Sequence, residues 1–203
     1  WLRENSHMDD PELPEIQSMT QLLIYSTMDL QAPWTIHFEE EEVQEDAFYL
    51  DSETVVTVPY LQRKEWSVFY QTDAFTRASF PTLGQVKVSF ILPSERVNPE
   101  DLLQTPESVA ELISGGNELH GEVTWGIPKF RTRNQLELRE MMEGMGLGVL
   151  FNEESNLSRL TEGTLFLHSV KQETAFEVNE KGVSASAISS LVLDGEAPIT
   201  VTA

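Results

Sequence analysis

The sequence contains no cysteine, and its 13 basic residues stand against 34 acidic ones, which gives a formal net charge of −21. Without cysteine, the chain has no disulfide, no zinc site built on thiolates and no thiol catalysis. With so few basic residues, it lacks the positive footprint with which proteins bind nucleic acid or anionic membrane surfaces. No apolar run approaches the roughly 18 residues of a membrane-spanning helix. We therefore expect neither nucleic acid nor membrane as a partner.

What is present is enough for a packed core, because 40% of the residues are hydrophobic and 9% are aromatic. The length of 203 residues fits one domain. Strand-like and helix-like segments mix without strict alternation, and no period repeats. This pattern predicts an α+β fold with large, mostly antiparallel sheets and a few packed helices.

The elements are predicted from apolar periodicity and capping signals. A buried strand is expected over 19–25, and an alternating strand over 48–60. Thr105 and Pro106 open a helix that Gly115 ends. Apolar spacing over 136–145 predicts another helix, ended by Gly146. Further strands are expected at these ranges: 66–70, 86–92, 121–130 and 165–178.

The acidic run 39–46 has no turn residues between its carboxylates, unlike a calcium loop. We interpret it as a solvated connection.

A search for catalytic or cofactor chemistry finds none. Residues 144–148 read Gly-Met-Gly-Leu-Gly, but they follow a helix, so we expect a helix stop rather than a phosphate loop. No Gly-x-Ser-x-Gly motif is present. The four histidines lack metal-ligand spacing, so we expect no metal site. They are His7, His37, His120 and His168. Because no catalytic or phosphate-binding motif is found either, we expect no cofactor and no enzymatic activity.

One stretch is specific. Residues 175–187 read A-F-E-V-N-E-K-G-V-S-A-S-A, which resembles the hinge pattern F-I-E-V-N-E-E-G-T-E-A-A-A of the serpins. Six further stretches resemble serpin motifs in the family's order. They are Trp34–Phe38 (W-x-x-x-F), Val58–Leu61 (V-P-M-M), Ile91–Pro93 (L-P-D-E), Ile127–Phe130 (L-P-K-F), the helix from Glu137 to Phe151 (D-L-x-x-x-L-x-x-L-G…F), and Asn156–Leu160 (A-D-L-S-G-I).

The resemblance implies a partial serpin fold over 1–203. Residues 1–18 would be the end of a sheet-crossing helix and a linker, and 19–181 the body of sheets and helices. Residues 182–200 would be the reactive-centre loop, and 201–203 the start of the next strand. The chain lacks an initiator Met and stops within an alternating pattern. We therefore expect it to be part of a longer serpin and to need the other parts of that molecule for stability.

By this resemblance the chain inhibits a serine protease by suicide trapping. The protease cleaves the loop, and the freed loop inserts as a new strand into the main sheet. Insertion demands small, uncharged residues, because a buried unpaired charge costs several kcal/mol. Residues 182–192 carry no charge and no proline, and Val183, Ala185 and Ala187 alternate along them. The implied hinge comprises Glu180, Lys181, Gly182, Val183, Ser184, Ala185, Ser186 and Ala187.

The cleaved bond is placed by counting. In the family it follows the seventeenth residue from the hinge Glu180, which gives Glu196–Ala197. Counting back from 201–203 favours Gly195 instead, and Leu193 is a further alternative. Glu196 would suit a Glu-preferring or elastase-like protease, and Leu193 a chymotrypsin-like or elastase-like one.

The sheet-opening region, with Trp34, departs from the family pattern. Ser26 stands where the family has Asn, and Gln172 where it has His. Our hypothesis is that Ser26 and Gln172 form a substitute polar contact, which would make sheet opening less dependent on pH than a histidine does. Ile188 is bulkier than the usual loop residue, which we expect to slow insertion.

A non-inhibitory serpin, such as a small-ligand carrier or chaperone-like member, is the alternative function. The small residues at 183–187 favour inhibition, because non-inhibitory members usually carry charged or bulky hinges. The resemblance also implies an extracellular, secreted protein.

Overall fold

The computed structural model describes residues 1–6, 8–50, 53–160 and 163–195. These residues form two compact units. Unit 1 comprises 1–30, 131–176 and 185 onward, and unit 2 comprises 31–130 and 177–184. None of the helices in the described ranges has the length and apolar character needed to cross a membrane.

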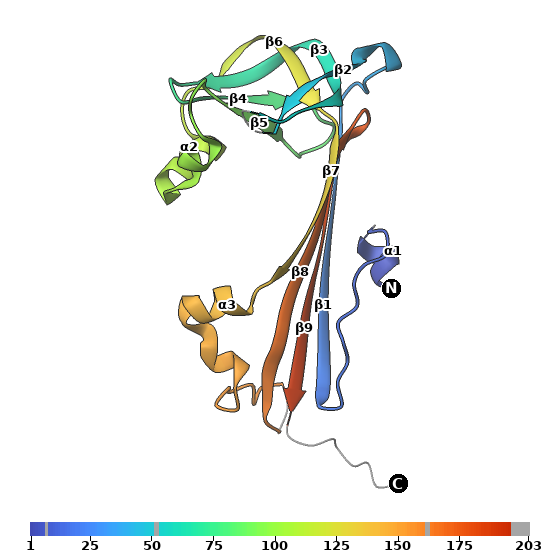
Figure 1. The fold of residues 1–203 in the computed structure, drawn as a ribbon, viewed down its shortest axis with the longest axis vertical. Coiled ribbons are helices and arrows are strands. Elements are labelled where there is room, and N and C mark those ends of the chain that lie inside the picture. The colour runs from blue at the N-terminus through green and yellow to red at the C-terminus, as the bar shows by residue number, and fades with distance from the viewer. Residues whose placement is uncertain (7, 51–52, 161–162, 196–203) are drawn as a thin grey trace. The chain divides into compact units, whose positions relative to one another are not determined.

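Unit 1 is built on a four-stranded sheet whose order is β1-β9-β8-β7 (Figure 1). The strands are β1 (Thr20–Pro33), β7 (Phe130–Glu137), β8 (Leu165–Asn179) and β9 (Gly182–Gly195). β8 and β9 are joined by Glu180 and Lys181 alone, so they run antiparallel as a hairpin. β9, the predicted reactive-centre loop, is therefore an inner strand between β1 and β8.

The helices of unit 1 are short: α1 (Leu2–Ser6), α3 (Arg139–Met142), the π-helical turn η3 (Glu143–Leu147) and the 3-10 turn η4 (Gly148–Phe151). The helix predicted over 136–145 begins only at Arg139, because β7 extends to Glu137 and the Leu138 N–H donates to the Val170 carbonyl. Gly146 adopts a φ of 86°, which suits glycine and ends the helix as predicted.

The apolar core of unit 1 joins Leu193 of β9 to the residues Phe151, Leu165, Leu167 and Val170. On another part of the sheet, the segment after α1 is fastened down by polar contacts. Arg133 donates to the carbonyls of Asp9 and Asp10 at 3.0 and 2.8 Å, and the Glu12 N–H donates to Glu173 at 3.1 Å. Met8 is buried.

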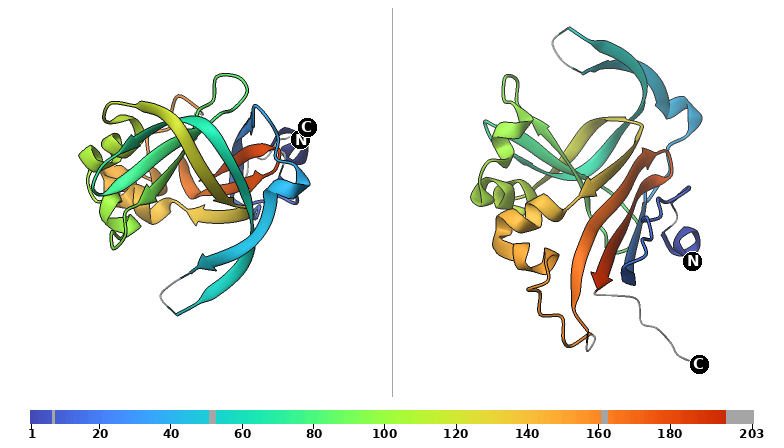
Figure 2. Two further views of the ribbon diagram at one scale, coloured as in Figure 1. Left: turned by 90° about the horizontal axis from the view of Figure 1, so that it is seen from above. Right: turned by 60° about the horizontal axis from the view of Figure 1, so that its bottom comes forward.

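Unit 2 contains a five-stranded antiparallel sheet of order β2-β3-β4-β5, in which β6 also pairs with β3. β3 pairs with β2, β4 and β6, which its length of 17 residues allows, and the β2–β3 hairpin extends beyond β4 and β5 (Figure 2). The elements are β2 (Val43–Tyr49), β3 (Val55–Gln71), β4 (Phe75–Phe80), β5 (Val88–Pro93), β6 (Leu119–Pro128), η1 (Glu40–Glu42), η2 (Pro99–Leu103) and α2 (Pro106–Ser114).

Two predictions in unit 2 have different outcomes. The Thr105 cap of α2 is confirmed, since its hydroxyl accepts from the Ser108 N–H at 3.1 Å. The acidic run 39–46 is more than a solvated connection. Val43 begins β2, and Glu42 forms a bidentate ion pair with Arg63, with N–O distances of 2.7 and 2.6 Å. That pairing lowers the pKa of Glu42, first through the hydrogen bond from Arg63.

Candidate functional site

Residues 179–182, from the end of β8 to the start of β9, form what we call the hinge turn, and three of its backbone carbonyls accept hydrogen bonds from the segment that follows β1. The Trp34 indole Nε1–H donates to the Asn179 carbonyl at 2.9 Å. The backbone N–H groups of Trp34 and Phe38 donate to the carbonyls of Lys181 and Glu180, each at 3.0 Å. All three acceptors are backbone carbonyls, so these hydrogen bonds do not depend on the side chains of residues 179–181.

Trp34 is fixed in turn by an aromatic core. It is fully buried, and its ring meets Phe80 edge-on at 4.9 Å between centroids. Trp125 meets Phe80 in the same way at 5.1 Å, and Phe38 stacks on Phe80 at 5.3 Å. Edge-to-face and offset-stacked pairs add specific attraction to their area burial. The predicted importance of Trp34 thus has a physical basis in its contact with the hinge turn.

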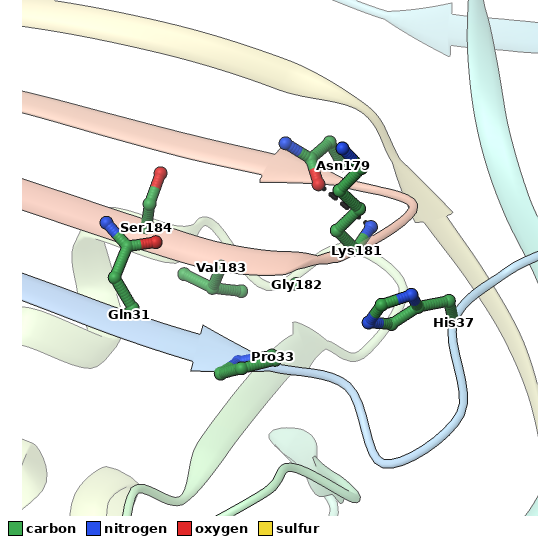
Figure 3. A pocket seen from close by; sticks show the side chains of 8 residues that line it. All are labelled: Gln31, Pro33, His37, Asn179, Lys181, Gly182, Val183 and Ser184. Carbon is green, nitrogen blue, oxygen red and sulfur yellow. Dashed lines mark hydrogen bonds between the residues drawn. The ribbon is translucent and has the colours of Figure 1, made fainter.

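Gly182 is needed for close approach. A Cβ built on Gly182 would lie 2.4 Å from the Ala32 carbonyl oxygen and 2.7 Å from the Pro33 Cα. The structure therefore adds a reason for glycine beyond the flexibility expected from the sequence. A pocket of about 330 Å³ opens beside the hinge turn (Figure 3), lined by Gln31, Pro33, His37, Asn179, Lys181, Gly182, Val183 and Ser184.

Glu180 of the hinge turn forms an ion pair with Lys129. The hydrogen bond from Lys129 lowers the pKa of Glu180, which keeps its carboxylate charged. The side chains are 35% and 27% exposed, so solvent screens part of this attraction.

β9 itself contains no charged residue from Gly182 to Leu193, as the sequence indicates. Its buried positions do not follow the alternation of Val183, Ala185 and Ala187. Beyond Val183, the buried residues are Ser186, Ile188, Ser190 and all four from Val192 to Gly195, whereas Ala185 and Ala187 are only half-buried. The bulky Ile188 is 3% exposed and is therefore accommodated within β9.

The predicted direct contact between Ser26 and Gln172 is not made. Ser26 lies on β1 and Gln172 on β8, and β9 separates these strands. Gln172 donates instead to the Ser189 hydroxyl of β9 at 3.4 Å. Ser186 of β9 donates to Asp29 of β1 at 2.9 Å. Gln172 of β8 and Asp29 of β1 thus each contact β9, which lies between their strands.

The far end of β9 contains residues that the sequence analysis missed. Asp194 is 5% exposed, accepts from the Thr20 hydroxyl at 3.1 Å and pairs with His168 Nδ1 at 3.0 Å. We had interpreted His168 as a surface or packing residue. The available signal was that Asp194 is the first charge after an uncharged stretch of the loop.

Other predictions about sites have simple outcomes. Glu196 and Ala197 lie outside the described residues, as does His7. Leu193 and Gly195 are buried at the end of β9. Within the described ranges, no group of three or more His, Asp or Glu side chains is arranged to hold a metal ion.

The structure thus contains an inner strand that is uncharged from Gly182 to Leu193, preceded by a turn that contacts a buried tryptophan. The family model described as "Serpin (serine protease inhibitor)" matches residues 6–203. The chain belongs to the serpin family. Members of this family are mostly inhibitors or binding proteins.

Individual relatives are distant. An antitrypsin of Bombyx mori is 21% identical over 210 residues, which covers 99% of this chain and 53% of the relative. The corticosteroid-binding globulin of Homo sapiens is 24% identical over 184 residues, or 88% of this chain and 45% of the globulin. The chain thus spans about half the length of the curated relatives it matches.

The serpin fold is also shown by solved structures. The loop-inserted structure of a cleaved ovalbumin mutant aligns with a TM-score of 0.88 at 16% identity, over 96% of this chain and 54% of that one. The predicted fold, a partial serpin rich in sheet with few helices, is confirmed.

Proposed function

We propose that the protein is a serine protease inhibitor that acts by suicide trapping, with residues 182–195 as the segment that inserts after cleavage. The observation that carries this proposal is β9 itself, an inner strand between β1 and β8 that is uncharged from Gly182 to Leu193. The relationship to an antitrypsin supports the same function. On this proposal the chain performs no catalysis of its own.

The chemistry follows the protease's own mechanism. The protease serine Oγ attacks the carbonyl of the residue before the cleaved bond, which we place at Glu196–Ala197. An ester forms to Glu196, the C–N bond breaks, and the amine of Ala197 leaves with the proton that the protease supplies. Water would normally hydrolyse the ester. Insertion of the freed segment carries the protease away before hydrolysis is complete.

The driving force for insertion is burial of the loop's apolar side chains. Val183, Ile188, Val192 and Leu193 are each at most 4% exposed in β9. Each such side chain is worth roughly 1.5–3 kcal/mol when it leaves water. Added backbone pairing on both edges of β9 stabilises the product further, so insertion is strongly favoured once the loop is cut.

The hinge turn serves as the fixed end of this movement. Its carbonyls are held by Trp34 and Phe38, so we infer that they stay in place while the loop pivots from Gly182 onward. The residues proposed for the hinge therefore have separate roles, with Glu180 and Lys181 as the anchor and residues 182–187 as the first part to insert.

The target proposed is a serine protease of the elastase-like, chymotrypsin-like or Glu-preferring type. We propose that the protein meets it outside the cell, as a secreted protein. We propose neither nucleic acid nor anionic membranes as further partners, because the excess of acidic residues would repel them. The other parts of the serpin fold are proposed to pack on the sheet of unit 1.

A carrier function is the second candidate. It is favoured by the similarity to human corticosteroid-binding globulin, a relative at 24% identity. Val183 and the small residues that follow it would permit insertion, which makes this candidate the weaker one.

The test uses the full-length protein with a panel of elastase-like, chymotrypsin-like, trypsin-like and Glu-specific proteases. We expect a covalent band at the summed mass on a denaturing gel, together with a large rise in the inhibitor's melting temperature after cleavage. The same protease with its active-site serine blocked is the control and gives no band. Cleavage without a covalent band or a gain in melting temperature would reject inhibition and favour the carrier.

A further inference from the structure

Asp194 is the one ionisable residue of β9, and it is buried at 5% exposure. A carboxylate brought into a sheet without partners would cost several kcal/mol. A strand that inserts with such a carboxylate therefore needs hydrogen-bond or ion-pair partners on the neighbouring strands.

The partners come from both neighbouring strands. The Thr20 hydroxyl of β1 donates to Asp194 Oδ1 at 3.1 Å, and His168 Nδ1 of β8 lies 3.0 Å from Oδ2. The same Thr20 hydroxyl accepts from the Gln17 N–H at 3.1 Å. Because its lone pair is used by Gln17, its own proton is left to point at Asp194.

The backbone of Gly195, which follows Asp194, also contacts the sheet. The Gly195 N–H donates to the Met19 carbonyl at 3.1 Å. A Cβ on Gly195 would lie 2.5 Å from the side-chain Cδ of Gln21. The sheet thus receives the strand up to Gly195, with Asp194 as the only charged group that it accommodates within β9.

We propose that Asp194 is the terminal anchor of the inserted strand, and that only cleavage beyond Asp194, after Gly195 or Glu196, leads to trapping. If the bond broke after Leu193, Asp194 would leave with the released C-terminal piece. Thr20 and His168 would then face no carboxylate, and the new strand would end two residues short.

This inference rests on the proposed inhibitory function and narrows its target. The protease to be trapped must accept an Asp-Gly-Glu stretch around the bond that it cuts. A protease with a deep apolar primary pocket that cuts after Leu193 would instead treat the loop as a substrate.

The first experiment maps the bond. The full-length protein is incubated with each protease of the panel, and the C-terminal peptide released on forming a covalent complex is identified by mass spectrometry. We expect peptides that begin at Glu196 or Ala197 wherever a complex forms. A stable complex whose peptide begins at Gly195 or earlier would overturn the proposal, because Asp194 would then lie in the protease pocket or be lost.

The second experiment tests the anchor with a residue that the protease does not touch. Thr20→Val keeps the shape of the side chain and removes its donor. We expect about threefold to tenfold more hydrolysed inhibitor per covalent complex, with the initial cleavage rate unchanged. Thr20→Ser keeps the hydroxyl and should restore the wild-type ratio. Asp73→Asn makes a charge change at an exposed site in unit 2 and should leave the ratio unchanged.

The two proposals fail in different ways. If no protease forms a covalent complex, inhibition is rejected, but the anchor is still tested by cutting the loop with a Glu-specific protease and measuring the melting temperature. Thr20→Val also removes the acceptor of the Gln17 N–H, which lowers the melting temperature whether or not the loop is cut. We therefore expect the melting temperature of Thr20→Val to fall below that of the wild type by several degrees more in the cleaved proteins than in the uncleaved ones. An equal fall before and after cleavage would reject the anchor.

Discussion

β9 is preceded by a turn that is held through its main-chain carbonyls, and near its own last residue it is held through a side chain. Trp34 and Phe38 grip the carbonyls of residues 179–181. At the far end, Thr20 and His168 contact the carboxylate of Asp194. On the proposed function, the main-chain contacts at the hinge turn persist whether or not the loop is inserted, whereas the contacts of Asp194 form only on insertion. We call the hinge turn, residues 179–182, the pivot, and the contacts of Asp194 with Thr20 and His168 the latch. Each prediction below tests one of these two features or the strand between them.

The largest effect is expected from a charge placed midway between the two ends. Ile188 is 3% exposed and borders a pocket that also contains Glu12 and Glu173. Ile188→Asp would bury a carboxylate where Arg133 and Lys171 already pair with Glu173 and Glu12, and the resulting excess negative charge costs several kcal/mol. We expect covalent complex formation to be abolished and all inhibitor to be hydrolysed. Leu103→Asp, at an exposed site, is the control. Complex formation by Ile188→Asp at the wild-type level would show that Ile188 is not inserted.

Next in size is Gly182→Ala at the pivot. The new methyl group would lie 2.4 Å from the Ala32 carbonyl oxygen, closer than real Cβ contacts allow. We expect insertion to be at least about tenfold slower, because the backbone must shift to relieve the clash. The insertion rate is measured from the change in intrinsic fluorescence on cleavage. Gly144→Ala, where nothing lies within 4 Å of the new methyl group, is the matched control. Equal rates for both variants would remove the close approach as the reason for glycine.

Trp34→Phe tests whether main-chain contacts hold the pivot. The variant keeps an aromatic ring but leaves the Asn179 carbonyl without its indole donor. We expect the free energy of unfolding to fall by about 1–3 kcal/mol, measured by urea denaturation. Trp66→Phe, at a position 67% exposed, should change it by less than about 0.5 kcal/mol. Similar small losses in both variants would mean that the hinge turn does not depend on Trp34.

The sequence predicted the pivot better than the latch, and the reason is physical. The pivot depends on local features, a Trp motif and a glycine within a conspicuous small-residue stretch, which can be recognised along the chain. The latch joins Thr20, His168 and Asp194, which are 174 positions apart at the extremes. Such a contact follows from the order of strands, and no local pattern gives that order.

The same limit explains the wrong contact between Ser26 and Gln172. Both residues were located correctly on strands that flank the insertion site, but the sequence does not reveal that β9 lies between them. The alternation of Val183, Ala185 and Ala187 also does not reveal which face of β9 is buried. Ser186, Ser190 and Asp194 are buried polar residues, and each has a place that depends on neighbouring strands rather than on its own hydrophobicity.

The smallest effect is expected from the ion pair at the pivot, where Lys129 lowers the pKa of Glu180. A carboxyl whose pKa is lower in the folded state stabilises the protein above its ordinary value of 4.5, and this contribution is lost as the pH falls through the folded pKa. Lys129→Met should therefore cost about 0.2–1 kcal/mol at pH 7, discounted for solvent screening. The difference from the wild type should shrink below pH 4.5, as urea denaturation at several pH values would measure. Lys64→Met, at a pair that is about two-thirds exposed, is the control. A difference that stays constant down to pH 3 would mean that Lys129 acts through packing, and the pivot would then rest on its main-chain contacts alone.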